Sequence, residues 1–164
     1  MGCTSRYGRL SLERKNALSL QRKATFVARV SLFEVEFKGI TVDVRNIDAV
    51  PAFTTKDGSE IRELLARRNS SIRNQSLAEA RVAPGQTTTP HYHPRTEEIY
   101  YILSGEGQMR IGDEARRVGP GDAIAIPPGE RHQITNTGRE MLKFLCCCAP
   151  GYEHDDTVLV EAPR

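Results

Sequence analysis

The sequence lacks any long apolar run. No stretch of its 164 residues approaches the roughly 20 apolar residues that a membrane-spanning helix needs. Its first residues also lack the short apolar core of a secretory signal, so we expect a cytoplasmic protein. The opening segment 1–6 resembles an N-myristoylation site, but Arg6 stands where that signal has Ser or Thr. Neither a membrane span nor a lipid anchor is therefore expected.

Cysteine is scarce as well. The chain has four, of which Cys146, Cys147 and Cys148 are consecutive. Adjacent residues of a strand point to opposite faces, so these three cannot easily form disulfides with one another. The run also lacks the C-x-x-C spacing of zinc sites. We expect free thiols that pack in the core in a reducing compartment, with a metal-ligating role for a cysteine as the alternative.

The body of the sequence has no excess of basic charge. Residues 1–41 contain eight Lys and Arg against three Asp and Glu, whereas residues 42–164 contain 15 against 18. Because the body has no basic stripe interleaved with stacking aromatic residues, we expect no nucleic-acid partner. Residues 1–41 are expected to form a basic, poorly ordered extension or to lie upstream of the native start. The alternative is that residues 30–37 add a strand to the fold.

Long helical patterns are missing too, and short apolar segments separated by turn residues take their place. Seven strands are predicted, over residues 77–82, 98–103, 108–111, 114–118, 123–126, 131–135 and 141–148. Regular short strands of this kind are typical of an all-β sandwich or barrel. We predict an antiparallel barrel over residues 74–150, an arm over 42–73 and a tail over 151–164. Within the arm, residues 59–65 form either a strand or a short helix.

Three of the four histidines occupy informative positions. His91 and His93 are two residues apart, so on a strand their side chains share a face. Glu98 follows after a bend, and His132 comes about forty residues later, just past a Pro-Pro-Gly turn. Three imidazoles and a carboxylate suit a divalent transition metal. A barrel interior could hold such a metal and leave coordination positions open to water or substrate.

The spacing around these residues is specific. The first segment has the form Gly85-x5-His91-x-His93-x4-Glu98-x6-Gly105, and the second Gly121-x5-Pro127-x-Gly129-x2-His132-x3-Asn136. These segments resemble the two signature motifs of the cupin superfamily, and all ten defining positions match. The resemblance covers about residues 74–150. It implies an all-β cupin fold, a double-stranded β-helix or jelly roll, with the four glycines and Pro127 as turn formers. Asn136 is expected to act as a turn residue and not as a ligand.

The resemblance also implies a metal site. Cupins that carry both motifs bind one divalent metal, which implies the ligands His91, His93, Glu98 and His132 here. Fe(II) is the first expectation, followed by Mn(II), Ni(II) or Zn(II). Glu97 competes with Glu98, although strand parity turns Glu97 outward.

Further contacts are predicted inside the barrel. Glu98 and Tyr100 are the candidate catalytic residues, and the Tyr100 hydroxyl is expected to contact substrate. The other side chains expected to line the barrel are Ile102, Leu142, Phe144, Cys146 and Cys148. Small cupins commonly form homodimers, for which residues 41–65 are the expected pairing segment.

Two functions are compatible with these features. The first is a metal-dependent enzyme acting on a small oxygenated metabolite, either as an Fe(II) dioxygenase or as an isomerase, lyase or decarboxylase of sugars or carboxylic acids. The second is a cupin that binds or senses a small ligand, such as a sugar, without turnover. In both cases the partner is a small molecule, and the fold does not choose between them.

Overall fold

Short strands and tight turns alternate along residues 42–160, the part of the chain that this computed structural model describes. The strands are β1 (Phe53–Thr54), β2 (Glu60–Leu65), β3 (Ser76–Val82), β4 (His91–Tyr92), β5 (Glu97–Ser104), β6 (Gly107–Ile111), β7 (Glu114–Val118), β8 (Ala123–Ile126), β9 (His132–Asn136), β10 (Leu142–Ala149) and β11 (Val158–Leu159). Two 3-10 helices of three residues each, η1 (Ile47–Ala49) and η2 (His154–Asp156), accompany them. No helix of these described residues is long and apolar enough to cross a membrane.

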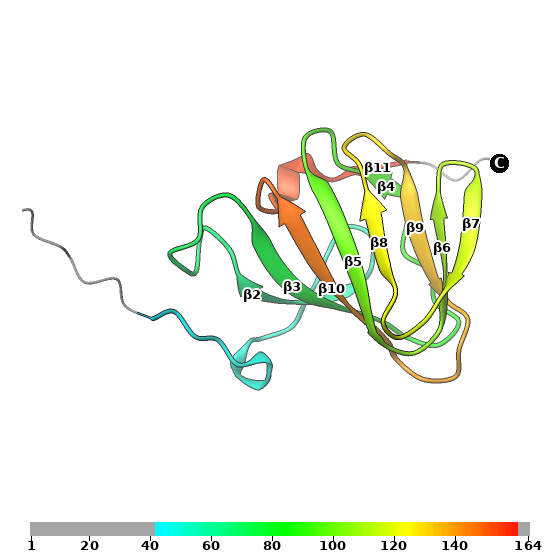
Figure 1. The fold of residues 1–164 in the computed structure, drawn as a ribbon, viewed down its shortest axis with the longest axis horizontal. Helices are drawn as coiled ribbons and strands as arrows, with labels where there is room; N and C mark the ends of the chain where they lie inside the picture. Colours follow the sequence, from blue (N-terminus) through cyan, green and yellow to red (C-terminus); the bar gives the residue numbers. More distant parts are fainter. Residues whose placement is uncertain (1–41, 161–164) are drawn as a thin grey trace, which may run out of the picture. The chain divides into compact units, whose positions relative to one another are not determined.

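The strands form two antiparallel sheets. One has the order β1-β2-β3-β10-β5-β8 and the other the order β11-β4-β9-β6-β7. The C-terminal η2 and β11 lie at the end of the barrel that carries β4 (Figure 1), because β11 pairs with β4. Both sheets include strands outside the predicted range 74–150. β1 and β2 precede this range in the sequence, and β11 follows it.

The barrel interior follows from strict alternation along the strands. In β10 every second residue is buried, and in β5 the buried positions are Glu98, Tyr100 and Ile102. Tyr100, Ile102, Leu142, Phe144 and Cys146 join one apolar core, and Cys148 is buried on the same face of β10. The set of barrel-lining side chains predicted from the sequence is thereby confirmed.

The predicted strands agree with those observed to within one residue at most ends. For residues 59–65 the strand alternative is right and the helix alternative is wrong, because β2 pairs with β3 through most of its length. The predicted ranges leave out η1, β1, β4, η2 and β11. Each of these has only two or three residues, too few to carry a periodic signal of its own. The expectations for residues 1–41 lie outside the described residues.

Asn136 ties the end of β9 to its neighbours. Its buried side-chain amide donates hydrogen bonds to the carbonyl oxygens of Val82 and Glu140, each at 2.8 Å. Its side-chain oxygen accepts a hydrogen bond from the Gly138 N–H at 2.9 Å. All three bonds are to backbone groups, so Asn136 acts in the turn, as the sequence predicted.

Candidate metal centre

Three strands deliver the four candidate ligands to one buried point. His91 is the first residue of β4, His93 follows that strand directly, Glu98 is the second residue of β5, and His132 is the first residue of β9. The register of β4 with β9 places His91 directly opposite His132. All four side chains are at most 5% exposed. Burial of four polar side chains at one point is costly unless they share a partner.

The distances within this group are short. One nitrogen of each of the three histidines lies within 4.8 Å of the others. The His91 and His132 ring centroids are 4.2 Å apart. The Glu98 carboxylate approaches the same point, since its Oε2 lies 3.5 Å from Nε2 of both His93 and His132. The structure thus brings together all four residues that the sequence nominated, and Glu97, the competing carboxylate, is exposed on the outer face of β5.

Backbone carbonyl groups orient all three rings through Nδ1. The accepting oxygens belong to Thr89 for His91 (2.8 Å), Asp156 for His93 (3.2 Å) and Glu130 for His132 (3.0 Å). A carbonyl oxygen can only accept, so each Nδ1 carries a proton. Nε2 is then the atom through which each ring can bind a metal, which is how protein metal sites commonly select the tautomer.

Two buried atoms have no hydrogen-bond partner among the described residues, namely Glu98 Oε2 and His132 Nε2. Both point toward the centre of the donor group. A divalent cation would satisfy both atoms at once, and a set of three imidazoles with one carboxylate matches the preference of first-row divalent metals. The residues present therefore fit a metal ion.

Electrostatics favour the ligand forms of these groups. Burial raises the pKa of Glu98, but the close His132 and His93 side chains outweigh this effect and bring the pKa to about 2. Burial, together with the charge of His132, lowers the pKa of His91. For His93, burial lowers the pKa, but contacts with Glu98 and Asp156 together raise it by more, so that its pKa ends above the usual value. Glu98 is thus an anion. A divalent cation could take the place of the histidine protons as the positive partner of this carboxylate.

Tyr100 lies beside the histidines on the same face of β5 as Glu98. Its ring centroid is 6.1 Å from that of His132 and 4.5 Å from that of Phe144. Burial, reinforced by the Glu98 charge, raises the pKa of Tyr100 well above its usual value. The hydroxyl group therefore stays protonated and can act as a hydrogen-bond donor.

Cys148 contacts the candidate centre in a way that the sequence did not predict. Its Sγ donates a hydrogen bond to Glu98 Oε1 at 3.3 Å, across the β10–β5 pair in which the two residues are register partners. Burial and the Glu98 charge both raise the pKa of this thiol, which keeps it a donor. Packing in the core was the role expected of the cysteines. The local sequence gives no indication that Cys148 forms a hydrogen bond with a residue of another strand.

The C-terminal segment also reaches the centre. Besides accepting from His93 through its carbonyl oxygen, Asp156 receives the Thr96 N–H on Oδ2 (3.0 Å) and Arg95 Nε on Oδ1 (2.8 Å). The Asp156 side chain is buried. The segment expected to be a tail thus carries a residue that holds the loop between His93 and Glu98.

A pocket adjoins the candidate ligands. Its walls come from the β1–β2 hairpin, β3, β10 and the C-terminal segment. The lining residues are Phe53, Thr55, Asp57, Ser59, Ile61, Glu63, Ser76, Ala78, Ala80, His91, His93, Glu98, Tyr100, Phe144, Cys146, Cys148, Tyr152 and Thr157. The sequence analysis did not single out Asp57, because nothing in the local sequence indicates that its turn lies beside the candidate ligands.

Comparison with known proteins agrees with this architecture. A family model described as "Cupin domain" matches residues 78–148. An uncharacterized protein of Methanocaldococcus jannaschii is 48% identical over 114 residues, which cover 70% of this chain and 91% of that protein. An oxalate-binding protein of Thermotoga maritima is 34% identical over 86 residues, or 52% of this chain and 71% of that protein.

Among solved structures, the polyketide cyclase RemF from Streptomyces resistomycificus superimposes with a TM-score of 0.62 at 25% identity, covering 75% of this chain and 88% of RemF. The motif spacing, the two-sheet barrel and these matches all point to one family. This chain belongs to the cupin superfamily.

Proposed function

We propose that this protein is a metal-dependent enzyme that acts on a small oxygenated metabolite. The observation that carries the proposal is the convergence of four buried donor groups, His91, His93, Glu98 and His132, with Glu98 Oε2 and His132 Nε2 left without partners. These residues would hold one divalent metal, with Fe(II) as the first candidate, then Mn(II), Ni(II) or Zn(II). When bound, the metal supplies Lewis acidity toward a carbonyl, enol or carboxylate oxygen.

The protein's own residues have separable roles in this proposal. The pocket beside the donors accommodates the substrate, and its apolar walls exclude water from it. Tyr100, held neutral by burial, donates a hydrogen bond to a substrate oxygen. Glu98 serves as ligand and as the buried negative charge nearest the reacting atoms. The RemF likeness supports an enzyme of this kind, with isomerase, lyase, decarboxylase and dioxygenase reactions as the candidates.

A second function, binding without turnover, is favoured by one comparison. The Thermotoga relative bears the name of an oxalate-binding protein. The two functions are separated by turnover assays of the metal-loaded protein against a panel of keto acids, sugars and enols, together with measurement of oxygen consumption. Turnover supports the enzyme, and saturable binding without product supports the binder.

Both functions require a bound metal, and the metal content of the purified protein tests this requirement. The purified protein is expected to hold about one divalent first-row metal per chain, and His93→Ala or His132→Ala is expected to lose most of it. His154→Ala is the matched control, because His154 is exposed on η2 and does not belong to the donor group. Full metal content in both ligand variants would refute the site.

A further inference from the structure

The pocket beside the metal centre is acidic. Three carboxylates line it, Asp57, Glu63 and Glu98, and among the described residues no lysine or arginine lines it. Apart from the His91 and His93 imidazoles and two thiols, the remaining polar side chains are hydroxyls, such as those of Thr55, Ser59 and Tyr152, and the walls between them are apolar. Recognition of an anion with two carboxylates normally uses cationic side chains that pair with each of them. This pocket offers none in the part of the chain that the structure describes.

Asp57 is held in a defined orientation at the β1–β2 turn. Its Oδ1 accepts hydrogen bonds from Thr55 Oγ1 (2.6 Å), Ser59 Oγ (2.8 Å) and Ser59 N (3.2 Å). All of these bonds end on Oδ1, which leaves Oδ2 available to a bound molecule. The Asp57 side chain is 7% exposed, so its charge acts in a low-dielectric environment where it is poorly screened.

Backbone contacts connect this turn to the metal centre. The Asp57 carbonyl oxygen accepts the Thr89 N–H at 2.7 Å, and the Thr89 carbonyl oxygen in turn orients His91. Asp57 therefore belongs to the same rigid rim as the candidate ligands.

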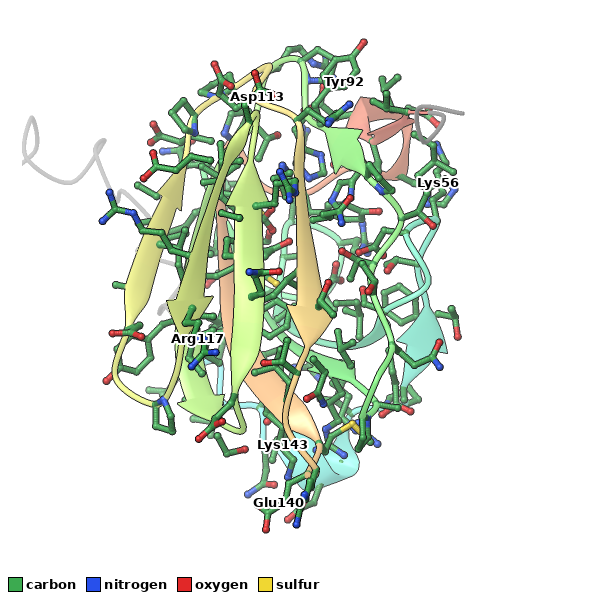
Figure 2. The ribbon with its side chains drawn as sticks, turned by 90° about the vertical axis from the view of Figure 1, so that its right-hand side faces the viewer. Lys56, Tyr92, Asp113, Arg117, Glu140 and Lys143 are labelled. Atoms are coloured by element: carbon green, nitrogen blue, oxygen red, sulfur yellow. The ribbon has the colours of Figure 1, made fainter. Side chains whose placement is uncertain are left out.

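The lysine next to Asp57 in the sequence and the arginine that contacts Glu63 both have partners of their own. Lys56, at the end of the barrel that also carries Tyr92 (Figure 2), directs its ammonium group to the carbonyl oxygens of His154 (2.8 Å) and Thr157 (3.2 Å). Arg68 forms an ion pair with Glu63, so that Glu63 is neutralised and Asp57 is not. The negative charge that a ligand meets beyond the metal is therefore that of Asp57.

We propose that Asp57 is a specificity-determining residue, and that the ligand is an oxygenated carbonyl compound that binds the metal with at most one negative charge. The proposal rests on the metal site proposed above. A divalent cation with three neutral imidazoles and Glu98 has a net charge of +1, from +2 and −1, which one enolate or one carboxylate neutralises. A second carboxylate, as in oxalate or malonate, would face Asp57 without a cation, whereas a hydroxyl group could donate to Oδ2.

The test compares acetylacetone with malonate. Both present two oxygens across a three-carbon spacing, but acetylacetone binds a metal as a monoanion and malonate as a dianion. Binding is measured on the Co(II)-loaded full chain by its visible absorption, after metal content has been established. Affinities are expressed relative to those for free Co(II) at the same pH. We expect the ratio of the affinity for acetylacetone to that for malonate to be about tenfold or more higher for the protein than for free Co(II).

Two variants test whether the Asp57 carboxylate causes this preference. Asp57→Asn keeps an Oδ1 acceptor for Ser59 and Thr55 and is expected to reduce the preference to within about threefold of the free-metal reference. Glu60→Gln is the matched control, because Glu60 lies on the same hairpin, is exposed and does not line the pocket; it should keep the wild-type preference.

The outcomes are distinguishable. Absence of bound metal in the wild-type chain overturns the proposed function and this inference with it. Bound metal with no preference for acetylacetone overturns this inference alone, and because that comparison uses the wild-type chain it does not depend on the folding of a variant. A wild-type preference that survives in a folded Asp57→Asn protein overturns the assignment to Asp57.

Discussion

The two oxygens of Glu98 have different surroundings. Oε1 accepts the hydrogen bond of Cys148 at 3.3 Å, and Oε2 faces His93 and His132 at 3.5 Å. A carboxylate rotates easily about its last bond unless one oxygen is held. The thiol of Cys148 therefore acts as a positioning group that turns Oε2 toward His93 and His132.

This contact predicts a difference between two substitutions of Cys148. Cys148→Val replaces the thiol by methyl groups and removes the donor, so metal affinity is expected to fall about tenfold, the lower end of what outer-shell partners contribute. Cys148→Ser keeps a donor and should stay within about threefold of wild type by the same reasoning. Titration against a competing chelator measures both. Equal affinities for the two variants would contradict the positioning role.

Asp156 combines a stabilising and a positioning contact. Asp156→Ala removes the acceptor of the buried Thr96 N–H and is expected to destabilise the fold by about 2 kcal/mol. The loss corresponds to a melting temperature lower by about 4–8 °C. The same side chain holds the segment whose carbonyl oxygen orients His93, so its loss should also lower metal affinity, by about tenfold.

Asp155→Ala is the control for this variant, since Asp155 is the exposed neighbour on η2. It should leave both the melting temperature and the metal affinity unchanged. Thermal unfolding and chelator competition on the same preparations provide the comparison. An Asp156→Ala protein with wild-type values for both would show that the C-terminal segment does not hold the His93 loop.

At the scale of elements, the turn between β5 and β6 depends on close approach to β10. Gly105 has φ +84°, and a Cβ at this position would lie 2.8 Å from Leu142 Cα and 2.9 Å from the Met141 carbonyl oxygen. Both atoms belong to the backbone, so they cannot rotate away. The glycine is required here for conformation and for space, which explains its place at the end of the first motif.

Gly105→Ala is therefore expected to destabilise the fold by about 2 kcal/mol or more, through left-handed strain and the backbone clash together. Gly85→Ala separates the two causes, because Gly85 also has positive φ, +73°, but a Cβ there would meet nothing within 4 Å. Gly85→Ala should lose about 1–2 kcal/mol, from strain alone. Chemical denaturation measures both, and equal losses would show that the approach to β10 is unimportant.

At the scale of the whole molecule, both sheets have edges that another chain could cover. β1 and β8 are the edges of one sheet, and β11 and β7 those of the other. The outer face of β5 also exposes Ile99 (48%), Tyr101 (43%) and Leu103 (41%). Since open edges and exposed apolar side chains favour association, we predict a homodimer. Light scattering at micromolar concentration, with metal bound, should give twice the chain mass, and a monomer mass would contradict the prediction.

A second prediction concerns residues 1–41. All the strands of the described chain lie within residues 53–159, and the cupin motifs begin at Gly85. A shortened chain that begins near Thr41 is expected to fold, to bind metal and to melt within a few degrees of the full chain. A fall of more than about 10 °C, or loss of solubility, would show that the segment contributes several kcal/mol to the fold.

Much of this architecture could be predicted from the sequence because it depends on local patterns. Alternation of period two along residues 98–102 determines that Glu98, Tyr100 and Ile102 share the inner face and that Glu97 does not. Turn residues mark the strand ends. The His91-x-His93 spacing and the two motifs likewise nominate the donor group without reference to any tertiary contact.

Other features were decided only by the tertiary structure. The carbonyl oxygen that orients His93 comes from Asp156, 63 residues away, and the thiol on Glu98 comes from Cys148, 50 residues away. Asp57 faces the pocket because the β1–β2 hairpin pairs with β3 and its turn bonds to Thr89. Such contacts have no periodic signal, since they depend on how the two sheets close over each other. The donor set is thus a property of the sequence, whereas its orientation and the charge of its pocket are properties of the closed barrel.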